Sequence, residues 1–436
     1  MDSGTSRRAA IRASGSSARD RRHPLATGAA GRALAILTLI NLFNYLDRFV
    51  VSALVESLKR SELALSDTQL GLLATGFIVV YTASSPLFGS LGDRGPRPRL
   101  IAAGVFAWSC ATALGGFARG FTSLLLARSA VGVGEAAYGT IAPAIIADLY
   151  PRSRLGRVMA IFFAAIPVGS ALGFVVGGLI DRAFGWRAAF LVAGTPGLAL
   201  ALLCLRMRDP VRGAQDSPVF LAAPAASADG VRTYLRLLRN RPYLLTVGGY
   251  AAYTFALGGM AFWMPAFLER VRGVSRAQAT VLFGAVVVMT GLAGTFAGGW
   301  LGDLILRRTR QAYLWLSGVA TLAAAPLAWL VFRTPDRASY LPAMILALFL
   351  LFASTGPINS AIVSEVSPAE RARAIALSIF AIHLLGDVPS PPLIGRISDA
   401  TSLASAVLIV PAAILAAGLI WTAAAWRGTR QARELR

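Results

Sequence analysis

The chain has 436 residues, of which 56% are hydrophobic and only 14% are charged, and its formal net charge is +21. This composition excludes an ordinary soluble domain, which needs more charged residues to cover its surface. A strong positive charge would favour nucleic-acid binding in a soluble protein. In a membrane protein, the positive charge is explained by arginines that anchor loops on one side of the bilayer. No nucleic-acid partner is therefore expected.

The apolar residues form runs of about twenty, the length that crosses the roughly 30 Å hydrocarbon core as a helix. Because backbone groups in lipid must be paired internally, these runs predict transmembrane helices. Residues 1–32 precede the first run, are rich in Arg, Ser, Gly and Ala, and predict a disordered cytoplasmic tail. The first bundle, residues 33–207, is predicted to contain helices at 33–56, 69–91, 99–118, 121–148, 157–181 and 187–206.

A polar segment at residues 208–241 follows and predicts a cytoplasmic linker between two halves. The second bundle, residues 242–426, is predicted to contain helices at 243–268, 278–302, 312–332, 341–364, 374–398 and 403–426. Residues 427–436 are predicted to form a second cytoplasmic tail. With both termini in the cytoplasm, most basic residues lie in cytoplasmic segments, as the positive-inside rule requires, and an even number of helices agrees with this orientation.

A short motif is repeated in the two halves. The sequence Gly-x-Leu-Gly-Asp ends at Asp93 in the first half and at Asp303 in the second, and Arg97 and Arg307 follow these aspartates at equal spacing. A second repeat links residues 144–151, which contain Asp148, with residues 361–368, which contain Glu365. Two repeats at nearly the same offset indicate duplicated bundles, with a site at their interface near the middle of the membrane.

The first motif resembles the loop signature of the major facilitator superfamily. Acidic residues and arginines recur together around this motif in both halves. This pattern favours a cytoplasmic gate that holds one conformation closed. The alternative is that the arginines serve only as topology anchors. The predicted gate residues are Asp93, Arg97 and Asp148 in the first half and Asp303, Arg307 and Glu365 in the second.

The first and fourth predicted helices each carry two charged residues in their interiors: Asp47 and Arg48 in the first, Arg128 and Glu135 in the fourth. Each would cost about 2.5–3.5 kcal/mol at the bilayer centre, so they must face a cavity or pair with one another. Arg128 and Glu135 are almost two helical turns apart and share a face. Asp47 and Glu135 are the candidate proton carriers, and a fixed ion-pair network is the alternative.

The eleventh helix carries a histidine and an aspartate at positions i and i+4, His383 and Asp387, which therefore share a face. Pro389, Pro391 and Pro392 follow and predict a bend. A role in substrate binding, proton binding or gating is expected; a structural histidine is the alternative. The chain has only two histidines, so no metal site and no cofactor are expected.

Several of these segments together resemble the spinster family of the major facilitator superfamily. They are Asn44-Tyr45-x-Asp47-Arg48, Gly71-Leu-Leu-Ala-Thr-Gly-Phe77, Val133-Gly-Glu-Ala-Ala-Tyr138 and His383-Leu-Leu-Gly-Asp387. The resemblance implies an all-α membrane protein with the major facilitator fold of twelve helices in two pseudo-symmetric six-helix bundles. It also implies transport of lysolipids or sphingoid-type amphiphiles, linked to protons, with Asp47, Arg48, Arg128 and Glu135 as charged cavity positions.

We therefore expect a secondary transporter that moves a lysophospholipid-like or sphingoid-phosphate-like substrate by alternating access and is coupled to protons. A transporter of a small organic anion or drug-like compound is the nearer alternative, and a non-transporting membrane sensor the more distant one. No phosphate-binding loop of an ATP-driven pump and no catalytic constellation occurs in the sequence, so an enzyme is not expected. A monomer in a bacterial inner membrane is expected, with lipid, protons and the bilayer as partners.

Overall fold

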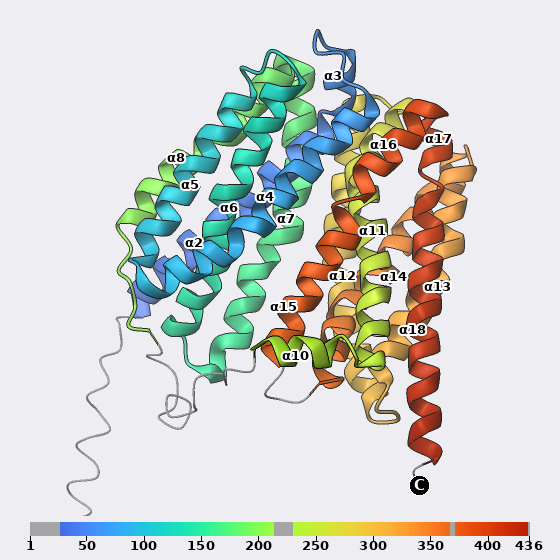
Figure 1. The fold of residues 1–436 in the computed structure, drawn as a ribbon. Coiled ribbons are helices and arrows are strands. Elements are labelled where there is room, and N and C mark those ends of the chain that lie inside the picture. The colour runs from blue at the N-terminus through green and yellow to red at the C-terminus, as the bar shows by residue number, and fades with distance from the viewer. Residues whose placement is uncertain (1–26, 213–229, 367–370, 435–436) are drawn as a thin grey trace, which may run out of the picture.

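The computed structural model describes residues 27–212, 230–366 and 371–434, and these are almost entirely helical (Figure 1). The first bundle contains α2 (Thr27–Ala53), α3 (Val55–Arg60), α4 (Asp67–Arg94), α5 (Arg97–Gly115), α6 (Phe121–Leu149), α7 (Arg152–Phe184) and α8 (Trp186–Leu205). The second contains α11 (Arg241–Arg270), α12 (Arg276–Leu306), α13 (Ala312–Arg333), α14 (Arg337–Ser364), α15 (Arg371–Ile382), η1 (His383–Asp387), α16 (Ser390–Ala400), α17 (Leu403–Ala406) and α18 (Ile409–Glu434).

Within the described ranges, eleven helical spans are long and apolar enough to cross a membrane. Helix α5 is the twelfth member of the set. It carries Arg97 and Arg99 in its first turn, which makes it less apolar, and it packs against α6 and α8 inside the first bundle. The prediction of twelve helices in two bundles is confirmed.

The predicted polar segments contain more helix than the sequence indicated. Helix α2 begins at Thr27, inside the predicted N-terminal tail, while residues 1–26 lie outside the described part of the chain. The predicted linker holds a short helix, α10 (Gly230–Leu237), and its residues 213–229 also lie outside the described part. Helix α18 continues through most of the predicted C-terminal tail, as far as Glu434.

The eleventh membrane helix is interrupted where the prolines occur. Helix α15 passes into a π-helical turn, η1, in which the backbone N–H of Val388 donates to the carbonyl of His383 at 3.1 Å. Helix α16 then begins at Ser390, and Pro391 and Pro392 occupy its first turn, where a missing N–H costs nothing. π-Helical turns concentrate at functional sites because they redirect side chains without ending the helix.

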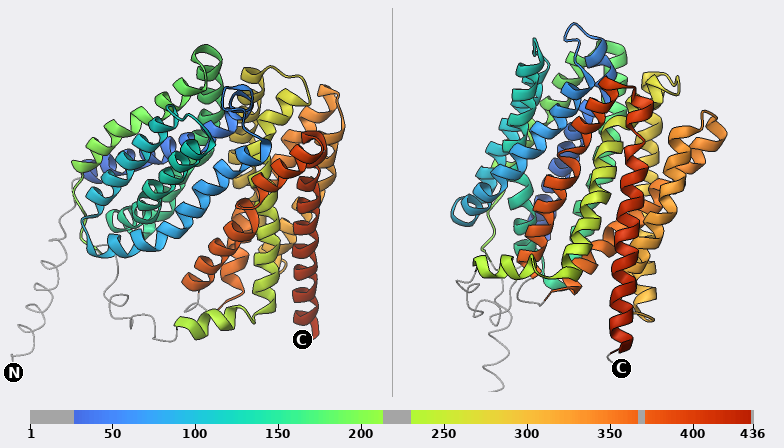
Figure 2. Two further views of the ribbon diagram at one scale, coloured as in Figure 1. Left: turned by 45° about the horizontal axis from the view of Figure 1, so that its top comes forward. Right: turned by 45° about the vertical axis from the view of Figure 1, so that its right-hand side comes forward.

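The two bundles meet at one end of the molecule. We call the end with α3 and α17 the far side and the end where the described chain starts and stops the termini side; the bundles diverge towards the latter (Figures 1 and 2). On the far side, α4 approaches α16 so closely that a Cβ at Gly71 would lie 2.5 Å from the Pro391 backbone. Helices α7 and α12 are also in contact there, through the rings of Phe174 and Phe283 at 5.1 Å.

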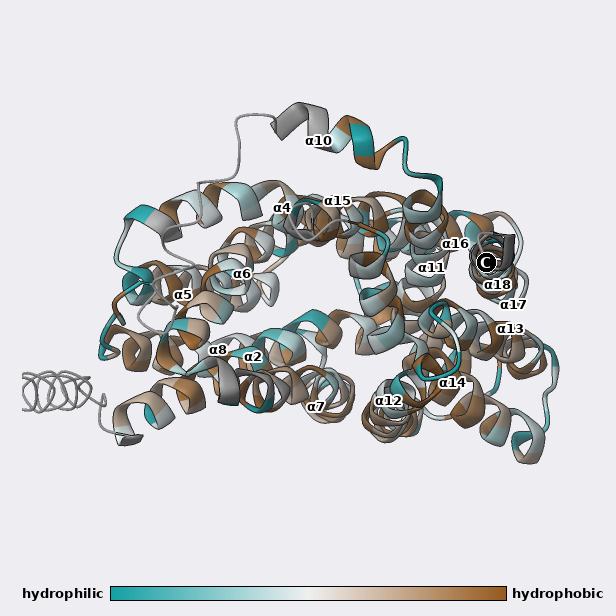
Figure 3. Cartoon of the chain, turned by 90° about the horizontal axis from the view of Figure 1, so that it is seen from below, coloured by the Kyte–Doolittle hydropathy of each residue, from teal (hydrophilic) through white to brown (hydrophobic). Residues whose placement is uncertain are grey.

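The view from the termini side shows the bundles side by side, with α10 crossing outside both (Figure 3). One large core of buried side chains continues from bundle to bundle, whereas a second core belongs to the first bundle alone. The second core includes Phe77, Trp108, Tyr138 and Phe162, and the charged residues of α2 and α6 lie beside it.

Candidate functional site

Two ion pairs cross between α2 and α6 and join Asp47, Arg48, Arg128 and Glu135. Arg48 Nε lies 2.7 Å from Glu135 Oε2, and Arg128 Nη1 lies 3.4 Å from Asp47 Oδ1. Thr112 of α5 donates its hydroxyl to the second oxygen of Asp47 at 2.6 Å. Neighbouring residues of α2 therefore bind partners that are two turns apart on α6.

One of these four residues is more exposed to solvent than the other three. Asp47, Arg128 and Glu135 are at most 2% exposed, whereas the Arg48 side chain is 22% exposed. Within the described residues, Glu135 Oε1, Arg128 Nε and the side-chain nitrogen of Asn44 are buried without a hydrogen-bond partner. Unpaired buried polar atoms are uncommon, and they leave hydrogen-bonding capacity for a proton, a water or a substrate group.

Aromatic rings surround the Arg48 guanidinium. Its central carbon lies 4.9 Å from the ring centre of Tyr45, 5.0 Å from that of Phe77 and 4.8 Å from that of Tyr81. A cation over a ring face is stabilised by about 2 kcal/mol or more when it is desolvated. The sequence placed Tyr45 and Phe77 in family motifs but gave no sign that their rings would meet one arginine.

The second bundle has a polar cluster of a different kind. His383 Nδ1 lies 3.0 Å from Asp387 Oδ1 on the π-helical turn, and both side chains are partly exposed. Tyr250 of α11 and Asn359 of α14 are hydrogen-bonded to each other at 3.3 Å. Neither was singled out by the sequence analysis, and no motif marks them.

The two clusters are joined through α4. Thr75 donates its hydroxyl to the carbonyl of Val388 at 2.6 Å, and Val388 follows directly after Asp387. Among the described residues no ion pair links His383 or Asp387 with the four charges of the first bundle. The structure thus brings the six predicted site residues into two separate clusters.

Two of the three gate residues predicted in the first half, Arg97 and Asp148, are in contact. Arg97 is buried and lies 2.5 Å from Asp148 and 2.8 Å from Asp209, and it also donates to the carbonyl of Pro210 at 2.6 Å. The side chain of Asp93 lies outside the described part of the structure. Asp209 falls in the predicted linker and was missed, because its position after the sixth helix gives no sign that it returns to Arg97.

The second half does not repeat this cluster. Asp303 accepts a hydrogen bond from the Tyr313 hydroxyl at 3.0 Å, and Arg307 is exposed. The backbone carbonyl of Glu365 accepts from the side chain of Asn240 at 3.0 Å. The structure therefore does not bring Asp303, Arg307 and Glu365 together.

A further set of charges, which the sequence analysis missed, joins the bundles on the far side. Arg270 of α11 lies 2.5 Å from Glu56 and 2.5 Å from Asp67, both of the first bundle. Asp399 of the second bundle accepts from the backbone N–H groups of Asp67 and Thr68 at 2.9 and 2.8 Å. These contacts place a carboxylate at the N-terminus of α4, where the helix dipole favours negative charge.

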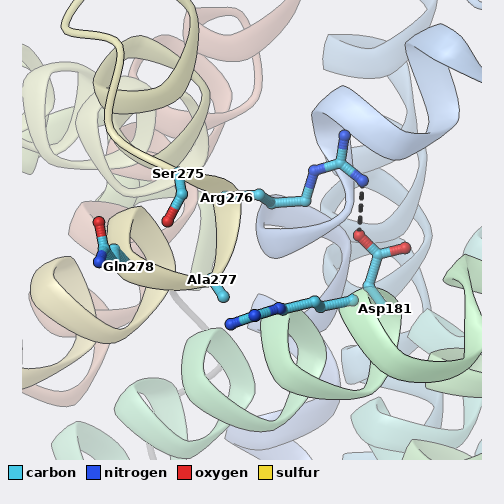
Figure 4. A pocket seen from close by; sticks show the side chains of 6 residues that line it. Asp181, Ser275, Arg276, Ala277 and Gln278 are labelled. Carbon is cyan, nitrogen blue, oxygen red and sulfur yellow. Dashed lines mark hydrogen bonds and ion pairs between the residues drawn. The ribbon is translucent and has the colours of Figure 1, made fainter.

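Beside this network, Arg276 of α12 lies 3.0 Å from Asp181 of α7 (Figure 4). The two residues line a pocket of about 520 Å³ together with Arg182, Ser275, Ala277 and Gln278. This pocket lies at the far-side ends of α7 and α12 and contains none of the charges on α2 and α6. We assign it to the contact between the bundles rather than to the site.

The sequence matches the Major Facilitator Superfamily model over residues 37–386. It is 33% identical over 383 residues to Protein spinster of Drosophila melanogaster, a match that covers 84% of this chain and 62% of the fly protein. It is 32% identical over 426 residues to the sphingosine-1-phosphate transporter SPNS2 of Danio rerio, covering 90% of this chain and 83% of the fish protein. The chain belongs to the spinster family of the major facilitator superfamily.

This spinster-family chain also resembles solved structures. A bacterial homolog of the human lysosomal transporter spinster, in an inward-facing and unoccupied conformation, superposes with a TM-score of 0.83 at 24% identity, covering 92% of this chain and 98% of the other. At that identity the likeness establishes the fold alone. The predicted family and the major facilitator fold are confirmed, and because the family is one of membrane transporters, the chain is not an enzyme.

Proposed function

We propose that this spinster-family protein is a proton-coupled secondary transporter of a lipid-like amphiphile with an anionic head group. The observation that carries the proposal is the crossed pair of ion pairs between α2 and α6, in which one arginine remains partly exposed. A lysophospholipid or a sphingoid phosphate has the required chemistry. The named substrate of the fish relative, sphingosine-1-phosphate, supports this class.

The head group would bind Arg48. A guanidinium presents a planar fork that matches phosphate and carboxylate oxygens, and charge-assisted hydrogen bonds of this kind are about twice as strong as neutral ones. Only Nε of Arg48 is engaged with Glu135. The two terminal nitrogens of this arginine are therefore the natural donors to an incoming anion.

The burial of Glu135 supports proton coupling. An anion that draws Arg48 away leaves this carboxylate buried and unpaired, a situation that costs about 3–5 kcal/mol in comparable buried pairs. Taking up a proton removes that cost. Substrate binding and protonation of Glu135 would therefore favour each other, and Asp47 with Arg128 offers a second, more deeply buried site for the same exchange.

Alternating access would consist of exchanging the far-side contact for one on the termini side. The ion pairs from Arg270 to Glu56 and Asp67 would have to open, and the predicted gate around Arg97 would take part in the closed termini side. The arginine-rich loops support a cytoplasmic location for the termini side. We also propose a monomer in a bacterial inner membrane, with bundles at residues 33–207 and 242–426, a linker at 208–241 and tails at 1–32 and 427–436.

The test is uptake of a labelled lysophospholipid into proteoliposomes with and without a pH gradient. The expected result is uptake that the gradient accelerates. Uptake of a small hydrophilic acid with no uptake of any amphiphile would replace the lipid substrate with an organic anion. Binding of the lysophospholipid without counterflow would replace the transporter with a sensor.

A further inference from the structure

One aromatic ring of the first bundle contacts both arginines of the ion pairs between α2 and α6. The Phe77 ring centre lies 5.0 Å from the guanidinium carbon of Arg48 and 5.5 Å from that of Arg128. These arginines belong to different ion pairs and to different helices, α2 and α6. Phe77 is the one ring that the described cation–π contacts share between the two pairs.

The place of this ring is fixed by backbone contact. Helices α4 and α6 approach so closely that a Cβ at Gly132 would lie 2.6 Å from the Phe77 carbonyl oxygen. Phe77 is 5% exposed and stacks on Tyr81 with ring centres 6.1 Å apart. The backbone that carries the ring is therefore held against α6, and burial leaves the ring little room to change rotamer.

Helix α4 also touches the second bundle. Thr75, two residues before Phe77, donates to the carbonyl of Val388 next to the π-helical turn. Any displacement of the second bundle that shifts this part of α4 would move the ring relative to both guanidinium groups. A cation–π contact weakens as the cation leaves the ring face.

We propose that Phe77 is a positioning residue that couples the Arg48–Glu135 and Asp47–Arg128 ion pairs to each other and to the contact between the bundles. Its ring stabilises both guanidinium groups in a desolvated place and holds them opposite their carboxylates. This role goes beyond the proposed transport function, although the charges concerned are those to which we assign proton coupling. The titratable and charged groups that surround the ring are Tyr45, Asp47 and Arg48 of α2, Tyr81 of α4, and Arg128 and Glu135 of α6.

The test replaces phenylalanine at position 77 by its mono-, di- and trifluorinated analogues, which weaken the ring quadrupole stepwise with little change of shape. Spin labels at Arg157→Cys and Leu306→Cys, exposed positions at the termini-side ends of α7 and α12, report the separation of the bundles in lipid nanodiscs. Cys110 and Cys204 are first replaced by alanine. The labels distinguish a short distance, with the bundles closed on the termini side, from a long one, with the bundles apart. We expect the ratio of these two populations to change monotonically with fluorine number, by about tenfold over the series.

The matched control is the same series at Phe162, which is buried in the same core and packs against Tyr138 rather than an arginine. Phe77→Leu is added to remove the ring while keeping an apolar side chain. A change with Phe77→Leu but none along the fluorinated series, or equal changes at Phe162, would show that Phe77 only fills space and would overturn the proposal.

The same measurement at several pH values separates this inference from proton coupling. Populations that respond to fluorination but not to pH would leave the role of Phe77 standing and remove proton coupling from the proposed function. Populations that respond to pH but not to fluorination would overturn the role of Phe77 and leave proton coupling in place.

Discussion

The two halves of this protein carry the same repeated motif but use it differently. In the first half, Arg97 is buried between Asp148, Asp209 and the carbonyl of Pro210. In the second half, Arg307 is exposed and Asp303 is bonded to Tyr313. The membrane interior shows the same contrast, since the first half has two buried ion pairs and the second a partly exposed histidine–aspartate pair on a π-helical turn.

This difference shows that duplication preserves sequence patterns more readily than charge networks. A buried ion pair needs several partners in register, and losing one leaves an uncompensated charge. In the second half Asp303 and Arg307 are exposed and Glu365 is only partly buried, so these counterpart residues form no buried ion pair. We infer that the first half is the more rigid electrostatic unit and the second the more adaptable one.

The largest expected effect is a difference in stability between two variants, each of which removes the motif arginine from one half. Arg97→Ala should lower the free energy of unfolding by about 3–5 kcal/mol because it removes a buried cation that two carboxylates share. Arg307→Ala should change it by no more than about 1 kcal/mol, as at other exposed charges. Unfolding in mixed micelles with increasing dodecyl sulfate measures both. Equal losses for the two variants would contradict the difference between the halves.

Transport should show the same asymmetry. Glu135→Gln and Asp47→Asn keep the fold but should each reduce gradient-driven lysophospholipid uptake by about tenfold or more, since the loss of a buried proton site removes more than the 1.36 kcal/mol that corresponds to that factor. Asp387→Asn should reduce it by no more than about fivefold because the His383–Asp387 pair is partly exposed. Proteoliposome uptake measures all three.

Glu62→Gln is the matched control for these carboxylate variants, since Glu62 lies on the far-side surface and pairs with Arg187. It should leave uptake unchanged. Uptake by Glu135→Gln and Asp47→Asn with the same pH dependence as the wild type would remove both residues from proton coupling.

A smaller effect, on the pH dependence of stability, is expected at Glu365, the counterpart of Asp148 in the second half. Burial raises the pKa of the Glu365 carboxyl above its ordinary value. The folded state therefore binds this proton more tightly than the unfolded state, and its stability falls as the pH rises from the ordinary glutamate pKa through the raised one. Glu365→Gln should remove this decrease, so that the variant melts slightly higher than the wild type at neutral pH and equally at acidic pH. Thermal melting against pH measures this, and a variant that melts lower at neutral pH would show that the charged form is stabilised instead.

Much of the fold could be predicted because it depends on local composition. Runs of apolar residues determine the helices, and the prolines after Asp387 indicated the break between η1 and α16. The helix ends were less predictable, since α2 begins at Thr27 and α18 runs to Glu434 through segments with few apolar residues. Helix α10 was missed because it is short and polar overall.

The candidate site could be predicted as a set of residues but not as a set of pairs. A charge inside an apolar run is costly wherever it lies, so the sequence alone marked Asp47, Arg48, Arg128 and Glu135. Which arginine meets which carboxylate depends on the rotation of α2 against α6, and this is set by packing. Tyr250 and Asn359 carry no charge, so nothing in the sequence marked them as site residues.

The sequence by itself determined that this is a membrane protein of two related halves in the spinster family, because hydropathy, repeats and motifs are properties of the chain. Only the tertiary structure decided that Arg97 binds Asp209, that Arg270 joins the bundles through Glu56 and Asp67, and that one ring at Phe77 serves two arginines. An ion pair needs its charged atoms within about 4 Å, and a cation–π contact needs the cation within about 6 Å of the ring centre. Their strength therefore depends on the separation of groups far apart in sequence, which only the packing of the helices sets.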